Sequence, residues 1–301
     1  MSEPAISLRA GGRDWRRLVV NRVAEASAVV AAGFAILVLA IVVWSVGSRA
    51  IGAINVDFFI KGPSSSFFGG GGGIAPAIVG TLMLVGIATA IALPIGVLTA
   101  IYVSEFGNEG FGRQIRLWLD VLNGFPSIVI GIFAFTFLVK QTFLGAGGHQ
   151  SAIAGGFALS IIMLPLVSRS TMEVLALVPN DLREASFALG VSKWQTVLRV
   201  ILPTSLGGIL TGTTLAVARA AGETAPLLFT CAIAGQIVDW NPTHSVQSIP
   251  LTIFFDSESA DPALHQQAWA AAFVLIVFVL VTSLTARILL ERQRRKLGLS
   301  R

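Results

Sequence analysis

A charged pair interrupts one of the most apolar parts of this 301-residue chain. The stretch "ARAAGETAPLLFT" (residues 218–230) carries Arg219 and Glu223, which are four residues apart and would share one face of a helix. A guanidinium in a low-dielectric path suits an oxyanion, which it binds through two parallel hydrogen bonds. The carboxylate would neutralise the arginine when the path is empty and weaken its hold on an anion. A structural ion pair without substrate contact is the alternative interpretation.

The residues around this pair predict a break in the helix. Pro226 lacks the N–H that would bond to the carbonyl of Gly222, so we expect a bend or a free carbonyl near Gly222 that lines a cavity. Arg219 falls near the middle of the predicted span. Small residues on the same face would let a helix or a ligand approach closely. The whole predicted face consists of Gly208, Gly212, Leu215, Arg219, Gly222, Glu223, Pro226 and Thr230.

The composition shows which kind of scaffold must position these residues. The chain is 54% hydrophobic and 12% charged, roughly half the charged fraction of ordinary soluble domains. Its apolar residues form blocks near the length of about 20 residues that crosses a bilayer as a helix. We therefore predict an all-α membrane protein with six transmembrane helices. The blocks run over residues 23–46, 75–103, 117–139, 151–167, 205–234 and 268–290.

The distribution of Lys and Arg predicts the orientation. Of the 21 such residues, only Arg49, Lys61 and Lys140 fall outside if the N-terminus lies inside, and Arg219 falls within a span, which leaves 17 inside. Positive charge gathers in cytoplasmic segments, so both termini are predicted to be cytoplasmic. The ends are an N-terminal tail (residues 1–22) and a basic tail (residues 291–301). Residues 47–74 form an external loop rich in Gly and Ser, which is typical of a flexible linker.

A cytoplasmic loop over residues 169–204 is too long for a passive connection. Asn180 and Asp181 resemble a helix start, and Ser192 is a plausible N-cap of a second amphipathic segment. Two short helices joined at Gly190 would make a compact knob. Its apolar face can bury against a partner, with Arg183 and Glu184 at the rim. An amphipathic hairpin lying on the membrane surface is the alternative.

The stretch "EASFALGVSKWQTVLRVILP" (residues 184–203) resembles the signature loop of ABC-importer permeases, which reads E-A-A, three residues, G, nine residues, I-x-L-P. Ser in place of the second Ala and Val in place of Ile are small departures. The resemblance implies the type I ABC importer permease fold, with a five-helix core over residues 75–290 and a loop that docks on a separate ATPase. The matching positions are Glu184, Ala185, Ser186, Gly190, Val200, Leu202 and Pro203.

Two further segments narrow the resemblance. Residues 219–230 ("RAAGETAPLLFT") and 124–133 ("GFPSIVIGIF") are similar to the A-type permeases of high-affinity phosphate ABC importers. That family implies a heterodimer with a homologous C-type permease, two copies of an ATPase and an external phosphate-binding protein in a bacterial cytoplasmic membrane. It also implies that Arg169 lies near the exit path, whereas the residue alone is explained by the charge rule for cytoplasmic ends. Asp120 and Asn123 are candidate partners of Arg169.

Other functions are less well supported. The chain has no G-x-x-x-x-G-K-[ST] motif, so ATP and Mg²⁺ would be bound by the partner ATPase, and we expect no cofactor on this chain. The three histidines show no metal-ligand spacing, and no nucleophile–base pair is identifiable, so we expect no metal site and no catalysis. A permease for molybdate or sulfate is the nearest alternative. A stand-alone secondary transporter is a second, against which the signature loop argues.

Overall fold

The computed structural model describes residues 12–63, 72–140, 149–231 and 237–296, and every regular element within them is helical. The predicted all-α class is therefore confirmed. Parts of several predicted segments lie outside the described residues. These are both chain ends (1–11 and 297–301), the centre of the Gly/Ser-rich loop (64–71) and the end of the predicted fifth span (232–236).

The chain divides into two units, residues 1–48 and residues 49–301. The first unit consists of most of helix α1 (Gly12–Ala50), whose apolar stretch Trp15–Ala50 is longer than the predicted span of residues 23–46. Large apolar side chains such as Phe34, Leu37 and Ile41 are exposed along it. Residues 26–48 of this helix carry no charged side chain, a composition and length typical of a membrane span.

Within the described residues, five helical segments are long and apolar enough to cross a membrane. They are Trp15–Ala50, Ala75–Phe106, Ala152–Ala176, Lys193–Ala221 and Pro262–Thr285. A sixth span arises where Gly110–Gly124 and Ser127–Val139 are taken together, although the two pieces meet at an angle of 98°. The six predicted blocks therefore all correspond to helices, and the third is sharply bent.

The bend in the third block follows from Pro126. Helix α4 (Glu109–Gly124) ends before it, and α5 (Ser127–Ala134) begins directly after it. Proline cannot donate a backbone hydrogen bond and pushes the residue before it out of the helical region. Phe125 accordingly has extended backbone angles, φ −68° and ψ 137°. A single-turn π-helix, η2 (Phe135–Val139), completes the second piece.

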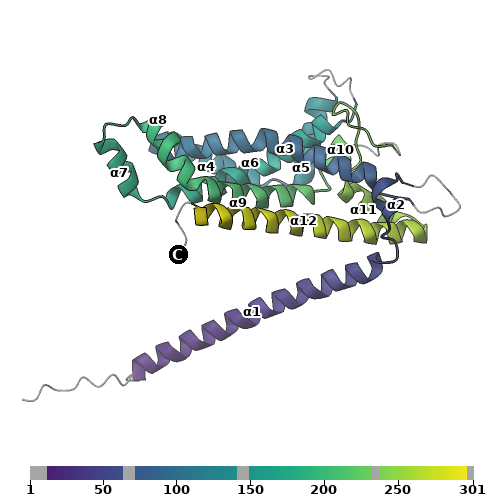
Figure 1. Ribbon diagram of the computed structural model, residues 1–301, viewed down its shortest axis with the longest axis horizontal. Helices are drawn as coiled ribbons and strands as arrows, with labels where there is room; N and C mark the ends of the chain where they lie inside the picture. Colours follow the sequence, from purple (N-terminus) through teal and green to yellow (C-terminus); the bar gives the residue numbers. More distant parts are fainter. Residues whose placement is uncertain (1–11, 64–71, 141–148, 232–236, 297–301) are drawn as a thin grey trace, which may run out of the picture. The chain divides into compact units, whose positions relative to one another are not determined.

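The second unit is a bundle in which α3 (Ala75–Ile101), α6 (Ala152–Ala176), α9 (Leu202–Ala221) and α12 (Pro262–Lys296) lie side by side (Figure 1). α6 packs between α3 and α9. Leu84, Leu159, Met163 and Ala216 are buried in one core cluster shared by these helices. Short elements occupy the end of the bundle opposite α7 (Figure 1). They are α2 (Val56–Ile60), α10 (Leu227–Thr230) and α11 (Ile249–Glu258).

Both predicted boundaries of the loop at residues 169–204 are wrong. α6 continues to Ala176, nine residues beyond the predicted end at Val167. The next span begins with α8 (Lys193–Thr196) and passes through the π-helix η3 (Val197–Ile201) into α9. The second predicted short helix is thus the first turn of a long one. What remains of the loop is α7 (Asn180–Ala188), its turn and α8, which we call the α7–α8 hairpin.

Asp256 in α11 carries a carboxyl oxygen that is buried without a hydrogen-bond partner in the described part of the chain. Burial raises the pKa of Asp256 from 3.8 to about 6. Because the folded state holds this proton more tightly than the unfolded chain does, ionisation costs stability. The cost is absent below about pH 4, grows as the pH rises to about 6, and persists above it.

We expect Asp256→Asn to raise the thermal unfolding midpoint of the purified protein by a few degrees at pH 7.5 and by nothing at pH 4. Thermal unfolding at the two pH values measures this. Glu258→Gln, an exposed change at the end of the same helix, serves as the control. An equal gain at both pH values would show that desolvation of the carboxylate is not the cause.

Candidate functional site

Arg219 and Glu223 are paired, but not in the middle of a span. α9 ends at Ala221, so Arg219 lies in its last turn rather than near the middle of an uninterrupted helix over residues 205–234. The Arg219 Nε and Glu223 Oε1 atoms are 3.7 Å apart. The Arg219 side chain is 54% exposed and that of Glu223 is 18% exposed. The arginine therefore keeps donors available, while the carboxylate is largely enclosed.

Backbone hydrogen bonds account for the end of α9. The N–H of Gly222 donates to Arg219 at 3.1 Å, and the N–H of Glu223 donates to Ala220 at 3.2 Å. Such i to i−3 bonds tighten a last turn and stop the helix. Gly222 is the C-cap of α9 and Pro226 is the N-cap of α10, so the chain between them is not regular helix. The charged pair spans this interruption.

A close backbone contact joins the interruption to α5. A Cβ built on Gly131 would stand 2.6 Å from the Cα atom of Pro226 and 3.0 Å from its carbonyl oxygen. Real Cβ contacts are essentially never shorter than 3.0 Å. Only glycine therefore allows this approach. The contact brings together the two segments, residues 124–133 and 219–230, that are far apart in the sequence.

The small residues on the predicted face serve helix packing. A Cβ on Gly208 would meet Val174 at 2.6 Å, and one on Gly212 would meet Ser170 at 2.2 Å, so both glycines face α6. These contacts also fix an antiparallel register between α6 and α9. Arg169 then lies level with residue 213, roughly 9 Å along the bundle from Arg219 at about 1.5 Å per residue. The two candidate path arginines thus lie at different depths.

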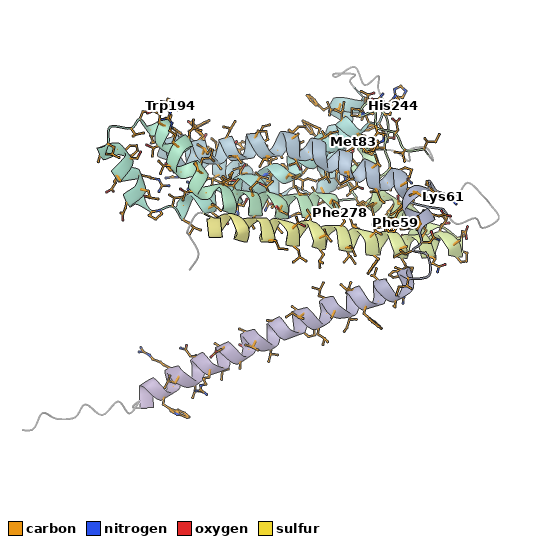
Figure 2. The ribbon with its side chains drawn as sticks, viewed as in Figure 1. Phe59, Lys61, Met83, Trp194, His244 and Phe278 are labelled. Atoms are coloured by element: carbon orange, nitrogen blue, oxygen red, sulfur yellow. The ribbon has the colours of Figure 1, made fainter. Side chains whose placement is uncertain are left out.

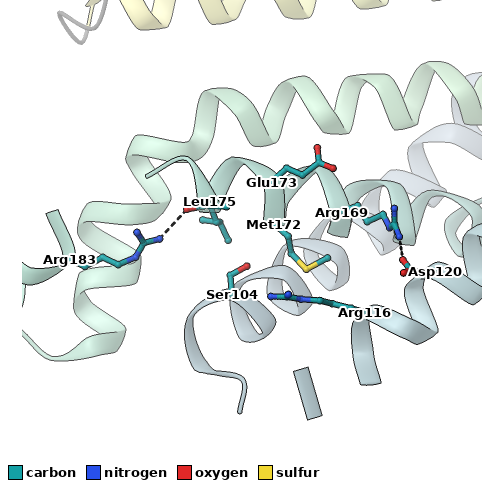
Figure 3. Close-up of a pocket in the computed structure, with 9 residues that line it drawn as sticks. Ser104, Arg116, Asp120, Arg169, Met172, Glu173, Leu175 and Arg183 are labelled. Atoms are coloured by element: carbon teal, nitrogen blue, oxygen red, sulfur yellow. Dashed lines mark hydrogen bonds and ion pairs between the residues drawn. The ribbon is translucent and has the colours of Figure 1, made fainter. Parts of the chain in front are cut away.

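A cavity of about 430 Å³ lies beside Arg169 at the end of the bundle that carries α7 (Figures 1 and 3). Arg169 forms an ion pair with Asp120 of α4, so one of its two candidate partners is confirmed. Arg169 lies inside α6 rather than at its end. Arg116 extends toward Ser104 beneath Met172 (Figure 3). The lining residues are Ser104, Arg116, Asp120, Arg169, Met172, Glu173, Leu175, Ala176 and Arg183.

The turn of the α7–α8 hairpin is a Schellman motif. Gly190 has φ +75°, its N–H donates to Phe187 at 2.9 Å, and the N–H of Val191 donates to Ser186 at 3.2 Å. These two bonds satisfy the last carbonyls of α7. α8 then starts at the N-cap Ser192, whose N–H donates to the Gln195 Oε1 atom at 3.3 Å. The predicted helix start and the glycine turn thus have direct geometric counterparts.

We expect Gly190→Ala to destabilise this turn by about 1 kcal/mol, because left-handed backbone is costly for a residue with a Cβ. A Cβ there would touch nothing within 4 Å, so the effect is confined to the backbone. Amide hydrogen exchange of residues 186–191 should become about fivefold faster, the equivalent of 1 kcal/mol. Gly110→Ala is the matched control, since that helical glycine is equally uncrowded and has no positive φ. Unchanged exchange would contradict the strain.

The remaining motif positions hold the hairpin against the bundle. The Ser186 and Thr196 hydroxyls lie 2.8 Å apart and are buried, so the serine that departs from the signature ties α7 to α8. Leu202 and Pro203 are the first residues of α9 and follow the π-helical turn η3 directly, where the regular hydrogen-bond ladder is already interrupted. Val200 lies in η3 between the buried residues Val197 and Ile201. These two pack with Ala100, Leu175 and Val178 in a separate core cluster.

The outer surface of the hairpin is apolar. Leu189 is 83% exposed, and Phe187 and Trp194 are about half exposed; Trp194 is labelled in Figure 2. Ala185 and Glu184 are also exposed. Arg183 was predicted at the rim beside Glu184, and this is wrong, because its side chain turns inward and is only 18% exposed. The hairpin thus offers apolar groups with a carboxylate beside them.

The family to which the chain belongs is shown by comparison with known sequences. A family model described as "Binding-protein-dependent transport system inner membrane component" matches residues 92–295. The chain belongs to this family of transporter membrane subunits. Its relatives include proteins named phosphate transport system permease protein PstA. The Xylella fastidiosa protein is 38% identical over 283 residues, covering 93% of this chain and 95% of its own length.

Two more relatives of the same name extend the range of organisms. The PstA of Haemophilus influenzae is 38% identical over 248 residues, covering 82% of this chain and 85% of its own length. PstA 1 of Mycobacterium tuberculosis is 39% identical over 228 residues, covering 74% of this chain and 72% of its own length. The resemblance to the A-type phosphate permeases is therefore confirmed.

Solved structures support the fold. The chain is similar to a chain of a bacterial alginate ABC transporter in complex with an alginate-bound periplasmic protein, with a TM-score of 0.61 and 14% identity, covering 94% of this chain and 97% of that one. A chain of an inward-facing MetNI methionine ABC transporter gives a TM-score of 0.56 and 17% identity, covering 73% of this chain and 94% of that one. The chain is a multi-pass membrane subunit with the ABC importer permease fold.

Proposed function

We propose that this chain is the permease subunit of an ATP-binding-cassette importer that moves inorganic phosphate across the bacterial cytoplasmic membrane. The observation that carries the proposal is the 38% identity to a PstA permease over almost the whole length of both chains. The half-exposed guanidinium of Arg219 adds chemical support, since such a fork suits an oxyanion. Both termini lie in the cytoplasm, in accord with the excess of Lys and Arg in the segments assigned there.

The working complex contains a homologous C-type permease, two copies of an ATPase and an external phosphate-binding protein that delivers the anion. ATP and Mg²⁺ are bound by the ATPase, and this chain carries no cofactor, metal site or catalytic group. The α7–α8 hairpin docks on the ATPase. Its exposed Phe187, Leu189 and Trp194 side chains support this, because an apolar patch rimmed by a charge is what a protein interface requires.

In this complex Arg219, Glu223 and Arg169 line the substrate path. Arg219 donates hydrogen bonds to the phosphate oxygens, and Glu223 limits how tightly the anion is held. Gly222 and Pro226 keep the backbone beside them out of regular helix. Arg169, paired with Asp120 beside the cavity, acts nearer the cytoplasmic exit. Two weak sites at different depths suit transport, because an anion must leave each site as readily as it arrives.

Dependence on ATP tests the transporter class. The four-component complex is reconstituted in proteoliposomes, and uptake of labelled phosphate is measured with the wild-type ATPase and with one whose Walker A lysine is replaced. We expect the replacement to abolish uptake. Uptake that continues without ATP hydrolysis would contradict the proposal and favour a secondary transporter.

A further inference from the structure

An ion pair fastens the hairpin to the end of α3. The Arg183 Nη2 atom of α7 lies 2.8 Å from the Glu105 Oε1 atom, and the Arg183 Nε atom lies 3.3 and 3.4 Å from the two carboxyl oxygens. The side chains are 18% and 7% exposed. A carboxylate gripped by two nitrogens of one guanidinium has a defined direction as well as a distance. Burial keeps solvent and salt from screening the pair.

The same guanidinium is anchored on its other side. The Arg183 Nη1 atom donates to the carbonyl of Val178 at 2.7 Å and to the Asn180 side chain at 3.2 Å. The Nη2 atom donates to the carbonyl of Leu175 at 3.0 Å, a contact drawn in Figure 3. Arg183 therefore joins three elements, namely α7, the C-terminal end of α6 and the segment that contains Glu105.

Glu105 lies in the turn that directly follows α3. It belongs to η1 (Tyr102–Phe106), a single π-helical turn that ends α3 before Gly107. The second arm of the hairpin touches the same turn, because the Lys193 Nζ atom of α8 lies 5.4 Å above the centre of the Phe106 ring. Both helices of the hairpin, α7 and α8, thus contact η1. π-turns interrupt the regular hydrogen-bond ladder and are frequent at functional sites.

We propose that the Glu105–Arg183 pair is the contact that carries movement of the α7–α8 hairpin into α3, so that ATPase motion opens and closes the substrate path. Glu105 and Arg183 are positioning residues that touch neither ATP nor phosphate. This inference rests on the proposed docking of the hairpin on the ATPase. The apolar cluster beneath the hairpin resists separation, but its contacts have no fixed direction. The buried ion pair has a fixed direction, so the hairpin and α3 move together.

The test measures coupling rather than activity alone. In the reconstituted complex, labelled phosphate uptake and ATP hydrolysis are recorded together for the wild type and for Glu105→Gln, which keeps the shape of the side chain and removes its charge. We expect assembly and ATP hydrolysis to persist, while phosphate transported per ATP falls about tenfold. Glu105→Asp and Arg183→Lys keep the charges and should recover part of the ratio. Glu258→Gln, a distant exposed carboxylate, should leave the ratio unchanged.

The outcomes separate the two proposals. Normal transport per ATP in Glu105→Gln would overturn the coupling role. So would a parallel fall in uptake, hydrolysis and thermal stability in Glu105→Gln and Glu105→Asp alike, because a merely structural pair gives that pattern. Lack of phosphate uptake by the wild-type complex would contradict the proposed function itself, and the coupling proposal with it.

Discussion

Gly131→Ala is expected to reduce phosphate uptake by the reconstituted complex at least tenfold. The added methyl group would stand 2.6 Å from the Cα atom of Pro226, and a backbone atom cannot rotate away as a side chain can. Either α5 or the segment between Gly222 and α10 must shift, at a cost of typically 1–3 kcal/mol for an overpacked contact. That segment carries Glu223 and follows Arg219, so the displacement reaches the charged pair directly.

The matched control is Gly86→Ala in α3. A Cβ at that helical glycine would meet nothing within 4 Å, so this change should leave uptake unaltered and stabilise the helix slightly. Uptake, complex assembly and thermal stability are measured for both variants. Unimpaired uptake in Gly131→Ala would show that the approach of α5 to Pro226 is not needed for transport.

Arg219→Gln and Glu223→Gln are expected to change transport in different ways. Arg219→Gln removes the charged donor fork, which in a charge-assisted contact contributes about 1.5–3 kcal/mol, so uptake should fall roughly tenfold or more. Glu223→Gln leaves Arg219 without its counter-charge. The anion should then be held more tightly and released more slowly, and the maximal uptake rate should fall. The half-saturating phosphate concentration should fall with it.

Concentration dependence of labelled phosphate uptake distinguishes these effects, with assembly of the complex checked in parallel. Arg113→Gln is the control, since it removes another exposed arginine, in the first part of α4. If both variants transport phosphate at the wild-type rate, the pair is only a structural ion pair, which is the alternative that the sequence left open.

The main elements of the fold could be predicted from the sequence because each rests on a local cause. Apolar blocks of membrane-spanning length predicted six helices, and each block contains a helix, although the third is bent and the fifth leaves regular helix after Ala221. The boundaries were less accurate because apolarity does not show where a helix stops. α6 runs past Arg169 to Ala176, since a basic residue near a membrane surface does not end a helix. The bend in the third block could have been predicted from Pro126 itself, but the block was judged by its length and treated as one straight helix.

In the candidate site, too, residues with a local role could be predicted from the sequence, and residues whose partners lie far along the chain could not. Gly190 and Ser192 were found because a turn and an N-cap are local features. Glu105 and Gly131 were missed because their partners, Arg183 and Pro226, lie 78 and 95 positions away. A glutamate at the end of an apolar block was the available hint, since a buried carboxylate requires a partner. Only the packing of α3, α6 and α7 shows which residue that is.

A comparison of the uptake of three oxyanions tests the central claim most directly. Proteoliposomes containing the complete complex and its external binding protein are given ATP and labelled phosphate, sulfate or molybdate, each at the same concentration. We predict ATP-dependent accumulation of phosphate at least tenfold above that of the other two anions, and its loss when this chain is omitted from the complex. ATP-dependent accumulation of sulfate or molybdate without phosphate would contradict the assignment of this chain as a phosphate permease.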